Sequence, residues 1–305
     1  MRSAGIDIGS RATKLVVVDG GRVVLRAVED TGCDPLAVCR RLLDGIAYDA
    51  LTATGYGRHL FKEHWPAAEV ISEITAVACG ATCLMPGCRT VVDIGGQDTK
   101  AITLDGAGKV RKFVMNDRCA AGTGQFLEMM ATALAYTREE FVAAAGRAAR
   151  AQRLSSMCTV FAQSEVVSLI ARGASKEEMA LGVHQSIASR TAALAGGVQV
   201  EEPVVFTGGC AHSGCLVSLL SAALKRPLQV PESPQTVAAL GCALHGLSLP
   251  MGNRVIAENV SPASLAPRRK ISYEGEHGRV SDRGEGAELA EPLPSAREAG
   301  RRGRV

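Results

Sequence analysis

The sequence predicts a mixed α/β protein made of a duplicated domain, and two observations support this. Residues 5–24 (GIDIGSRATKLVVVDGGRVV) alternate apolar runs with glycine-containing turns, which is the pattern of three consecutive strands. The same pattern returns at residues 92–110 (VDIGGQDTKAITLDGAGKV). The residues shared at a constant offset of 86 positions are Asp7 and Asp93, Ile8 and Ile94, Gly9 and Gly95, Thr13 and Thr99, Lys14 and Lys100, Asp19 and Asp105, Gly20 and Gly106, and Val24 and Val110. Such a constant offset indicates duplication of one folding unit.

Helical segments separate and follow these strands. Apolar residues at helical spacing predict helices over residues 35–46, 72–83, 138–152 and 176–194. Residues 52–58 (TATGYGR) have the pattern of a strand that enters a glycine-rich turn. We therefore expect a first domain over residues 1–88, a second over residues 89–249, and a tail over residues 250–305.

The expected tail differs in composition from the rest of the chain. Residues 251–305 hold 10 Lys and Arg against 8 Asp and Glu, with many Gly, Pro and Ala residues and little apolar periodicity. A segment of this composition buries too little apolar surface to offset the entropy lost on folding. We expect it to be disordered.

Composition and charge exclude several classes of protein. The 305 residues are 47% hydrophobic, enough for one large core or two medium ones, and the formal net charge of +3 is too small to indicate nucleic-acid binding. No apolar run reaches transmembrane length and the N-terminus has no signal-peptide pattern, so we expect a soluble, cytoplasmic protein. The 10 cysteines are then expected to be reduced thiols in an anoxic cytoplasm, not a disulfide framework.

The duplicated hairpins have the features of a phosphate and metal site. Each begins with a strand that ends in Asp-Ile-Gly, and glycine in the turn lets backbone N–H groups approach a phosphate without a Cβ clash. The carboxylates of Asp7 and Asp93 are expected to face one cleft. Since Mg²⁺ is usually held by one or two carboxylates together with water and phosphate oxygens, the hairpins predict a site for Mg²⁺ and a phosphorylated ligand.

Cys119 lies in a second distinctive segment, residues 114–128 (VMNDRCAAGTGQFLE). A polar turn precedes the cysteine, a glycine-rich step follows it, and Phe126, Leu127, Met130 and Leu134 then have helical spacing. We expect Cys119 at a helix N-terminus, where free N–H groups and the helix dipole stabilise a thiolate or an anionic metal cluster. The alternative is a small buried cysteine without a function.

Six further cysteines are expected to be packing residues. Cys79, Cys83 and Cys88 have spacings that match no zinc or cluster signature, so they are expected to be small packing residues. Packing is also expected for Cys210, Cys215 and Cys242, and the helical residue His184 is expected to be either packed or solvated. The chain has no P-loop motif, which removes a rival ATP-binding fold.

These motifs resemble the actin, Hsp70 and sugar-kinase superfamily, in which two ribonuclease-H-like domains clamp ATP. The hairpins resemble its two phosphate motifs, VVFTGGCAHS (204–213) its adenosine motif, and AALGCAL (238–244) its last glycine-containing helix. DIGGQDTK (93–100), NDRCAAGTGQFLE (116–128) and CTVFAQSEVVS (158–168) are similar to the activators of 2-hydroxyacyl-CoA dehydratases and to the related ATPase subunits of benzoyl-CoA reductase. The similarity covers about residues 4–248.

The resemblance implies an α/β fold of two ribonuclease-H-like domains with a nucleotide cleft between them, and it implies roles for particular residues. Asp7 and Asp93 would hold Mg²⁺, while Gln97 and Asp98 would place the attacking water. The residues expected to bind ATP are Gly9, Ser10, Thr13, Lys14, Gly95, Gly96, Gly122, Gly124, Gly208, Gly209 and Gly241.

The resemblance also implies an iron–sulfur cluster. Cys158, like Cys119, is expected to precede a helix. Two thiolates cannot complete a four-iron cluster, which needs four ligands, but a two-fold dimer presents the same two cysteines twice. One [4Fe-4S] cluster shared between the subunits of a homodimer is therefore expected.

The expected function is that of an ATP-hydrolysing electron donor. A ferredoxin or flavodoxin would reduce the cluster, and ATP would drive a low-potential electron to a 2-hydroxyacyl-CoA dehydratase, with neither nucleic acid nor a membrane as a partner. Three alternatives remain at this point: a subunit of a benzoyl-CoA-reductase-type complex, a small-molecule kinase of the same superfamily, and a regulatory ATPase without redox activity. The acyl-CoA substrate binds the partner, so it cannot be predicted from this chain.

Overall fold

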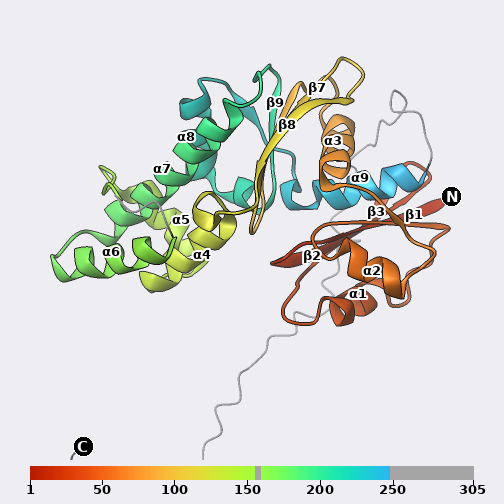
Figure 1. The fold of residues 1–305 in the computed structure, drawn as a ribbon, viewed down its shortest axis with the longest axis horizontal. Coiled ribbons are helices and arrows are strands. Elements are labelled where there is room, and N and C mark those ends of the chain that lie inside the picture. Colours follow the sequence, from red (N-terminus) through yellow and green to blue (C-terminus); the bar gives the residue numbers. More distant parts are fainter. Residues whose placement is uncertain (155–158, 248–305) are drawn as a thin grey trace, which may run out of the picture. The chain divides into compact units, whose positions relative to one another are not determined.

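The computed structural model describes residues 1–154 and 159–247, and these form two five-stranded sheets of the same topology (Figure 1). Sheet A has the strand order β3-β2-β1-β4-β5, with β1 (Arg2–Ile8), β2 (Ala12–Asp19), β3 (Arg22–Asp30), β4 (Ala50–Thr54) and β5 (Glu69–Val70). Sheet B has the order β8-β7-β6-β9-β10, with β6 (Thr90–Ile94), β7 (Thr99–Leu104), β8 (Val110–Asn116), β9 (Val204–Thr207) and β10 (Leu228–Gln229). The predicted duplication is confirmed strand by strand.

The helices fall close to where the apolar spacing predicts them. They are α1 (Pro35–Leu43), α2 (Arg58–His64), α3 (Glu73–Leu84), α4 (Gly124–Ala133), α5 (Arg138–Arg147), α6 (Thr159–Ala171), α7 (Lys176–Ala195), α8 (Gly214–Leu224) and α9 (Val237–Gly246), with short 3₁₀ helices η1 (Ala120–Gly122), η2 (Gly209–His212) and η3 (Pro234–Thr236). Two helices are shorter than expected. α1 stops before Asp44, and α5 stops before Ala148, because both residues have extended backbone angles.

Strand register places the two aspartates at equivalent points. β1 and β2 are antiparallel with Asp7 opposite Lys14, and β6 and β7 repeat this with Asp93 opposite Lys100. β4 and β9 are each parallel to the aspartate-bearing strand. Because parallel strands end at the same sheet edge, Asp7 lies beside the C-terminal end of β4 and Asp93 lies beside that of β9.

Sheet A is covered on both faces. Leu15 and Val17 of β2 pack with Val38 of α1 and Phe61 of α2. Side chains that alternate with them point to the other face, where Val16 and Val18, together with Cys79 and Cys83 of α3, pack against α9. The cysteines of α3 therefore pack, as expected, and burial also holds for Cys88, Cys210 and Cys242.

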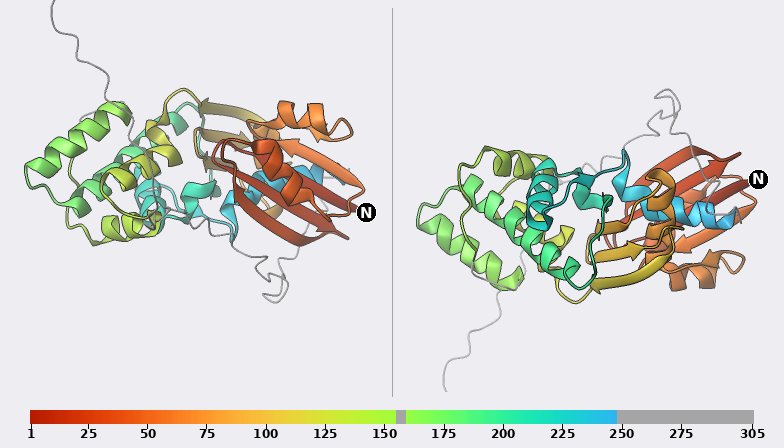
Figure 2. Two further views of the ribbon diagram at one scale, coloured as in Figure 1. Left: turned by 90° about the horizontal axis from the view of Figure 1, so that it is seen from below. Right: turned by 90° about the horizontal axis from the view of Figure 1, so that it is seen from above.

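Sheet B carries the larger helical layer (Figure 2). Val92 and Phe206 of its strands pack with α4, α5, α7 and α8 in one continuous cluster. On the opposite face, Val91 and Ile102 pack with Val77 of α3. His184 of α7 is fully buried in the helical layer, with its ring centroid 5.2 Å from that of Phe141.

Helices α3 and α9 approach each other so closely that only glycine fits at their crossing. A Cβ on Gly241 would lie 1.8 Å from the backbone oxygen of Ala76, and one on Gly80 would lie 2.1 Å from that of Val237. Gly241, which the resemblance places at the nucleotide, thus has a packing function in this structure. Both helices also pack across the expected boundary at residues 88/89. α3 precedes this boundary and contacts sheet B, whereas α9 follows it and contacts sheet A.

Two expectations fall outside the described residues: the tail at residues 250–305 and the cluster ligand Cys158. Among the helices within residues 1–154 and 159–247, none combines the length and the apolar character that crossing a membrane would require.

Candidate functional site

The two strand-end aspartates each pair with the lysine that faces them across the hairpin. Asp7 and Asp93 are both 8% exposed. The Nζ atom of Lys14 lies 3.0 Å from Asp7 Oδ2, and that of Lys100 lies 3.5 Å from Asp93 Oδ2. Burial raises the pKa of Asp7, while the positive charge of Lys14 opposes that shift. The duplicated sequence has thus produced two carboxylate–ammonium pairs.

Two further carboxylates lie close to the ammonium group of Lys100. Its Nζ lies 2.7 Å from Asp98 Oδ2 and 2.8 Å from Glu73 Oε2, and the residue is 2% exposed. Burial alone would lower the pKa of Lys100, but Asp93, Asp98 and Glu73 outweigh it and raise the pKa above its ordinary value. Lys100 is therefore a permanent cation, and Asp98 is held by it in an ion pair.

The site as a whole has an excess of negative charge. Four carboxylates (Asp7, Glu73, Asp93 and Asp98) lie beside two ammonium groups (Lys14 and Lys100) and the guanidinium of Arg58, whose Nη1 is 4.0 Å from Glu73 Oε1. The formal charge of this set is −1 when all are ionised. Hard oxygen donors with surplus negative charge suit a divalent cation such as Mg²⁺. The residues present therefore fit the expected metal.

Sequence reasoning missed two residues of this site. Glu73 begins α3, where the Ser72 side chain accepts a hydrogen bond from Thr75 N, so the sequence shows only an ordinary helix start. Thr207 ends β9 and its Oγ1 donates to Asp93 Oδ1 at 2.7 Å. Thr207 precedes the two glycines of the expected adenosine motif, and that position was the available signal.

The turns of the hairpins present free backbone donors, although not all the expected ones. The N–H of Gly9 donates to Ala12 O at 3.1 Å, and the N–H of Gly95 donates to Asp98 O at 2.9 Å, so both close their own turns. Within the described residues, no acceptor is found for the N–H groups of Ser10, Arg11, Gly96 and Gln97. An anion between the hairpins would be met by these four groups.

The expected adenosine motif forms a tight turn beside the second hairpin. Gly208 has φ of +88°, and a Cβ there would lie 2.2 Å from Ile94 O, so both backbone angle and space require glycine. Gly209 begins η2, and Ser213 then caps α8 by accepting from Leu216 N at 3.2 Å. Burial raises the pKa of Cys210 to about 12, which keeps this thiol neutral.

Cys119 differs in position from the expectation. It precedes the three-residue helix η1, and the longer helix α4 starts only at Gly124. Asn116 holds the cysteine instead: its Oδ1 accepts from Cys119 N at 3.2 Å, and its Nδ2 donates to Cys119 O at 2.8 Å. Cys119 is exposed, so the alternative of a buried structural cysteine is wrong for this residue.

The segment that carries Cys119 is attached directly to the second hairpin. The hydroxyl of Thr99 donates to Gly122 O at 2.7 Å, and both residues are buried. The N–H of Gly124 donates to Gly95 O and the N–H of Gln125 to Gly96 O, each at 2.9 Å. The start of α4 is therefore fixed to the turn that is expected to bind phosphate.

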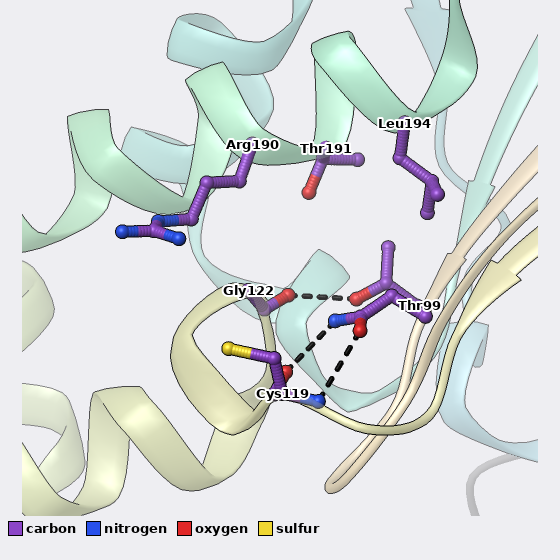
Figure 3. Close-up of a pocket in the computed structure, with 7 residues that line it drawn as sticks. Thr99, Cys119, Gly122, Arg190, Thr191 and Leu194 are labelled. Carbon is purple, nitrogen blue, oxygen red and sulfur yellow. Dashed lines mark hydrogen bonds between the residues drawn. The ribbon is translucent and has the colours of Figure 1, made fainter. Parts of the chain in front are cut away.

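A cavity of about 270 Å³ lies between this segment and α7 (Figure 3). Arg190 of α7 and Cys119 of the η1 segment lie on its wall, and the Thr99–Gly122 hydrogen bond lies on the side of the sheet. The residues that line it are Thr99, Asn116, Cys119, Gly122, Arg190, Thr191 and Leu194.

Neither expected metal site is complete in the described part of the chain. Among residues 1–154 and 159–247, no three His, Cys, Asp or Glu side chains are placed to hold a metal ion together. Magnesium bound at Asp7 and Asp93 would need phosphate and water oxygens, which is its usual situation. A cluster bound at Cys119 would need further thiolates.

Two sheets of one topology, each with a strand-end aspartate at its first hairpin, define an α/β fold of the actin and sugar-kinase type. The chain belongs to the BadF/BadG/BcrA/BcrD ATPase family, whose model matches residues 36–246. A ROK family glucokinase from Streptomyces griseus shares the fold at a TM-score of 0.52 and 14% identity.

Individual relatives of this chain include two activators of acyl-CoA dehydratases and one protein of benzoyl-CoA reductase. The chain is 42% identical over 254 residues to the activator of lactoyl-CoA dehydratase of Anaerotignum propionicum, covering 80% of this chain and 97% of that protein. The activator of 2-hydroxyisocaproyl-CoA dehydratase from Clostridium difficile, solved with bound ADPNP, matches with a TM-score of 0.74 and 35% identity, covering 81% and 94%. One of the subunits of benzoyl-CoA reductase from Thauera aromatica is 32% identical over 80% of this chain and 92% of that protein.

Proposed function

We propose that this protein is an ATP-dependent activator that passes a low-potential electron to a 2-hydroxyacyl-CoA dehydratase. The observation that supports this most is the attachment of the Cys119 segment to the second phosphate hairpin by Thr99, Gly124 and Gln125. A protein that only phosphorylates a small molecule needs no exposed cysteine fixed to its phosphate turn. A protein that couples ATP to electron transfer needs such a connection.

In this proposal the carboxylate site binds Mg-ATP and hydrolyses it. Asp7 and Asp93 hold Mg²⁺ directly or through water, and the turn N–H groups of Ser10, Gly96 and Gln97 bind phosphate oxygens. Gln97 is exposed and orients the attacking water. Asp98 is ion-paired with Lys100, so its role is to keep that lysine in place and to shape the site.

Cys119 and Cys158 ligate one [4Fe-4S] cluster between the subunits of a homodimer. Thiolates are the usual ligands of such clusters, which supply one-electron chemistry when bound. The exposed thiol of Cys119 suits a ligand that meets a second subunit. α6, which follows Cys158, exposes Phe161 at 68% and Val167 at 59%, and a dimer would cover such apolar side chains.

The partners follow from the same scheme. A ferredoxin or flavodoxin would supply the electron, and an acyl-CoA dehydratase of the kind named for the relatives would receive it. The similarity to the benzoyl-CoA reductase protein of Thauera aromatica supports a second candidate, in which the chain is a stable subunit of a ring reductase. Co-purification separates the two, because an activator leaves its dehydratase whereas a stable subunit stays bound to its complex.

The proposal is tested by anaerobic purification of the wild type and of Cys119→Ala, Cys158→Ala and Cys33→Ala. Each of the first two changes removes two of the four thiolates of a shared cluster, so we expect iron to fall from about two atoms per chain to nearly none. Cys33 is also exposed and serves as the matched control, with unchanged iron. About four irons per chain in a monomer, or iron retained in Cys119→Ala, would contradict the shared cluster.

A further inference from the structure

Arg11 lies at the turn of the first hairpin, at the position equivalent to Gln97 in the second. Its side chain crosses the gap between the hairpins: a Cβ on Gly96 would lie 2.4 Å from Arg11 Cγ and 2.9 Å from Arg11 Cβ. Glycine at position 96 therefore leaves the space in which this arginine lies. The guanidinium continues to α4, where its Nη2 pairs with the Oε2 atom of Glu128.

Glu128 is shared between two arginines. Arg138 Nη2, at the start of α5, donates to Glu128 Oε1 at 2.8 Å. Arg138 belongs to the same helical layer as α4, whereas Arg11 comes from sheet A. Thus Arg11 links the first phosphate hairpin to the helix whose start is already fixed to the second hairpin through Gly124.

The link between Arg11 and Glu128 can be exchanged at little cost. The side chain of Arg11 is 54% exposed and that of Glu128 is 28% exposed, and ion pairs in such positions are weak. When Arg11 leaves, Arg138 still pairs with Glu128, so no carboxylate is left without a partner. A nucleotide phosphate between the hairpins carries more charge than one carboxylate, and arginine binds phosphate through paired N–H groups.

We propose that Arg11 is a nucleotide-binding residue that exchanges Glu128 for the phosphates of the bound nucleotide, and so releases α4 from the first hairpin. This inference rests on the proposed function only in requiring a nucleotide in the cleft. Because binding linkage is reciprocal, removing the carboxylate of Glu128 strengthens nucleotide binding, and binding of nucleotide loosens α4. The segment that follows Cys119 thereby senses the occupied cleft.

Calorimetric titration of the full-length protein with Mg-AMPPNP tests the exchange. We expect Arg11→Gln to weaken binding about tenfold, as loss of a charge-assisted contact does. Glu128→Gln should tighten it about two- to fivefold, since it frees Arg11 from an exposed pair. In the Arg11→Gln background, Glu128→Gln should have no effect. Glu139→Gln removes an equivalent charge from the exposed start of α5 and is the matched control, expected to bind like the wild type.

Hydrogen exchange measured by mass spectrometry provides the second readout. Mg-AMPPNP should speed amide exchange in α4 of the wild type, and Glu128→Gln should show part of this increase without nucleotide. Wild-type protein that fails to bind Mg-AMPPNP would overturn the proposed function and this inference together. Binding by the wild type with no change in Arg11→Gln, or tighter binding from Glu128→Gln in both backgrounds, would overturn only the role of Arg11.

Discussion

At the scale of single residues, Asp7 and Asp93 occupy equivalent strand ends in different surroundings. Asp7 pairs with Lys14, whereas Asp93 accepts from the Thr207 hydroxyl and lies near Lys100. Asparagine in place of either keeps the size but removes the charge that Mg²⁺ requires. We expect Asp7→Asn and Asp93→Asn each to lower Mg-dependent ATP hydrolysis at least about tenfold, since a positioned metal contributes several kcal/mol to phosphoryl transfer.

The measurement is steady-state phosphate release at saturating Mg-ATP. Asp19→Asn is the control, because Asp19 lies at the far end of β2 in an exposed pair with Arg2. Wild-type turnover in both Asp7→Asn and Asp93→Asn would show that these carboxylates do not hold the catalytic metal.

His184 makes stability depend on pH. It is fully buried, its Nδ1 lies 2.8 Å from Ala180 O, and its Nε2 has no hydrogen-bond partner within the described residues. Burial lowers its pKa, although the contact with Ala180 O opposes this. The unfolded chain therefore takes up a proton that the folded chain resists, so stability should fall as pH drops below about 6.5, the ordinary pKa of histidine.

Urea unfolding at pH 7.5 and pH 5.5 checks this. The loss of stability between the two pH values should be smaller in His184→Gln than in the wild type, even though the loss of ring packing against Phe141 lowers stability at both. An equal loss in both proteins would place the proton uptake on other groups.

At the scale of elements, the crossing of α3 and α9 depends on glycine. A methyl group at position 241 would meet backbone oxygen, which cannot rotate away. We expect Gly241→Ala to destabilise the fold by about 3 kcal/mol, or roughly 6–12 °C in Tm. Gly146 in α5 is the matched control, because nothing lies within 4 Å of a Cβ there. Gly146→Ala should stabilise by about 0.5–1 kcal/mol through helix propensity, and thermal unfolding of the two variants gives opposite shifts if the argument holds.

Elements with regular spacing were predictable, and contacts between distant elements were not. The hairpins, α3 and α7 follow from strand and helix periodicity in the sequence. The start of α4 was misplaced because the glycines within residues 119–124 allow either a helix start or a 3₁₀ turn, and the local hydrogen bonds between Asn116 and Cys119 accompany the 3₁₀ turn. Glu73 was missed because its partner Lys100 lies in β7, distant in the sequence, and no local pattern records that pairing.

At the scale of the whole molecule, the duplication could be predicted from the sequence because it repeats residues with a chemical function. Asp, Gly, Thr and Lys recur at 86-residue offset, and the structure turns that repetition into two sheets of one topology. The sheet against which each of α3 and α9 packs could not be predicted from the sequence. The buried faces of α3 and α9 both consist of small and apolar residues, which pack equally well on either sheet, so the sequences do not show which sheet each helix contacts.

The last prediction concerns how much of the chain the fold requires. Both sheets and every helix named above lie within residues 1–247, and the family model ends at residue 246. The composition of residues 251–305 indicates little buried apolar surface, and a segment that buries little contributes little to stability. Truncation after Leu249 leaves α9 intact, so Tm, iron content and ATP hydrolysis should match those of the full chain. Differential scanning fluorimetry, an iron assay and phosphate release on both proteins check this, and a lower value in any of the three would assign the tail a role in folding or function.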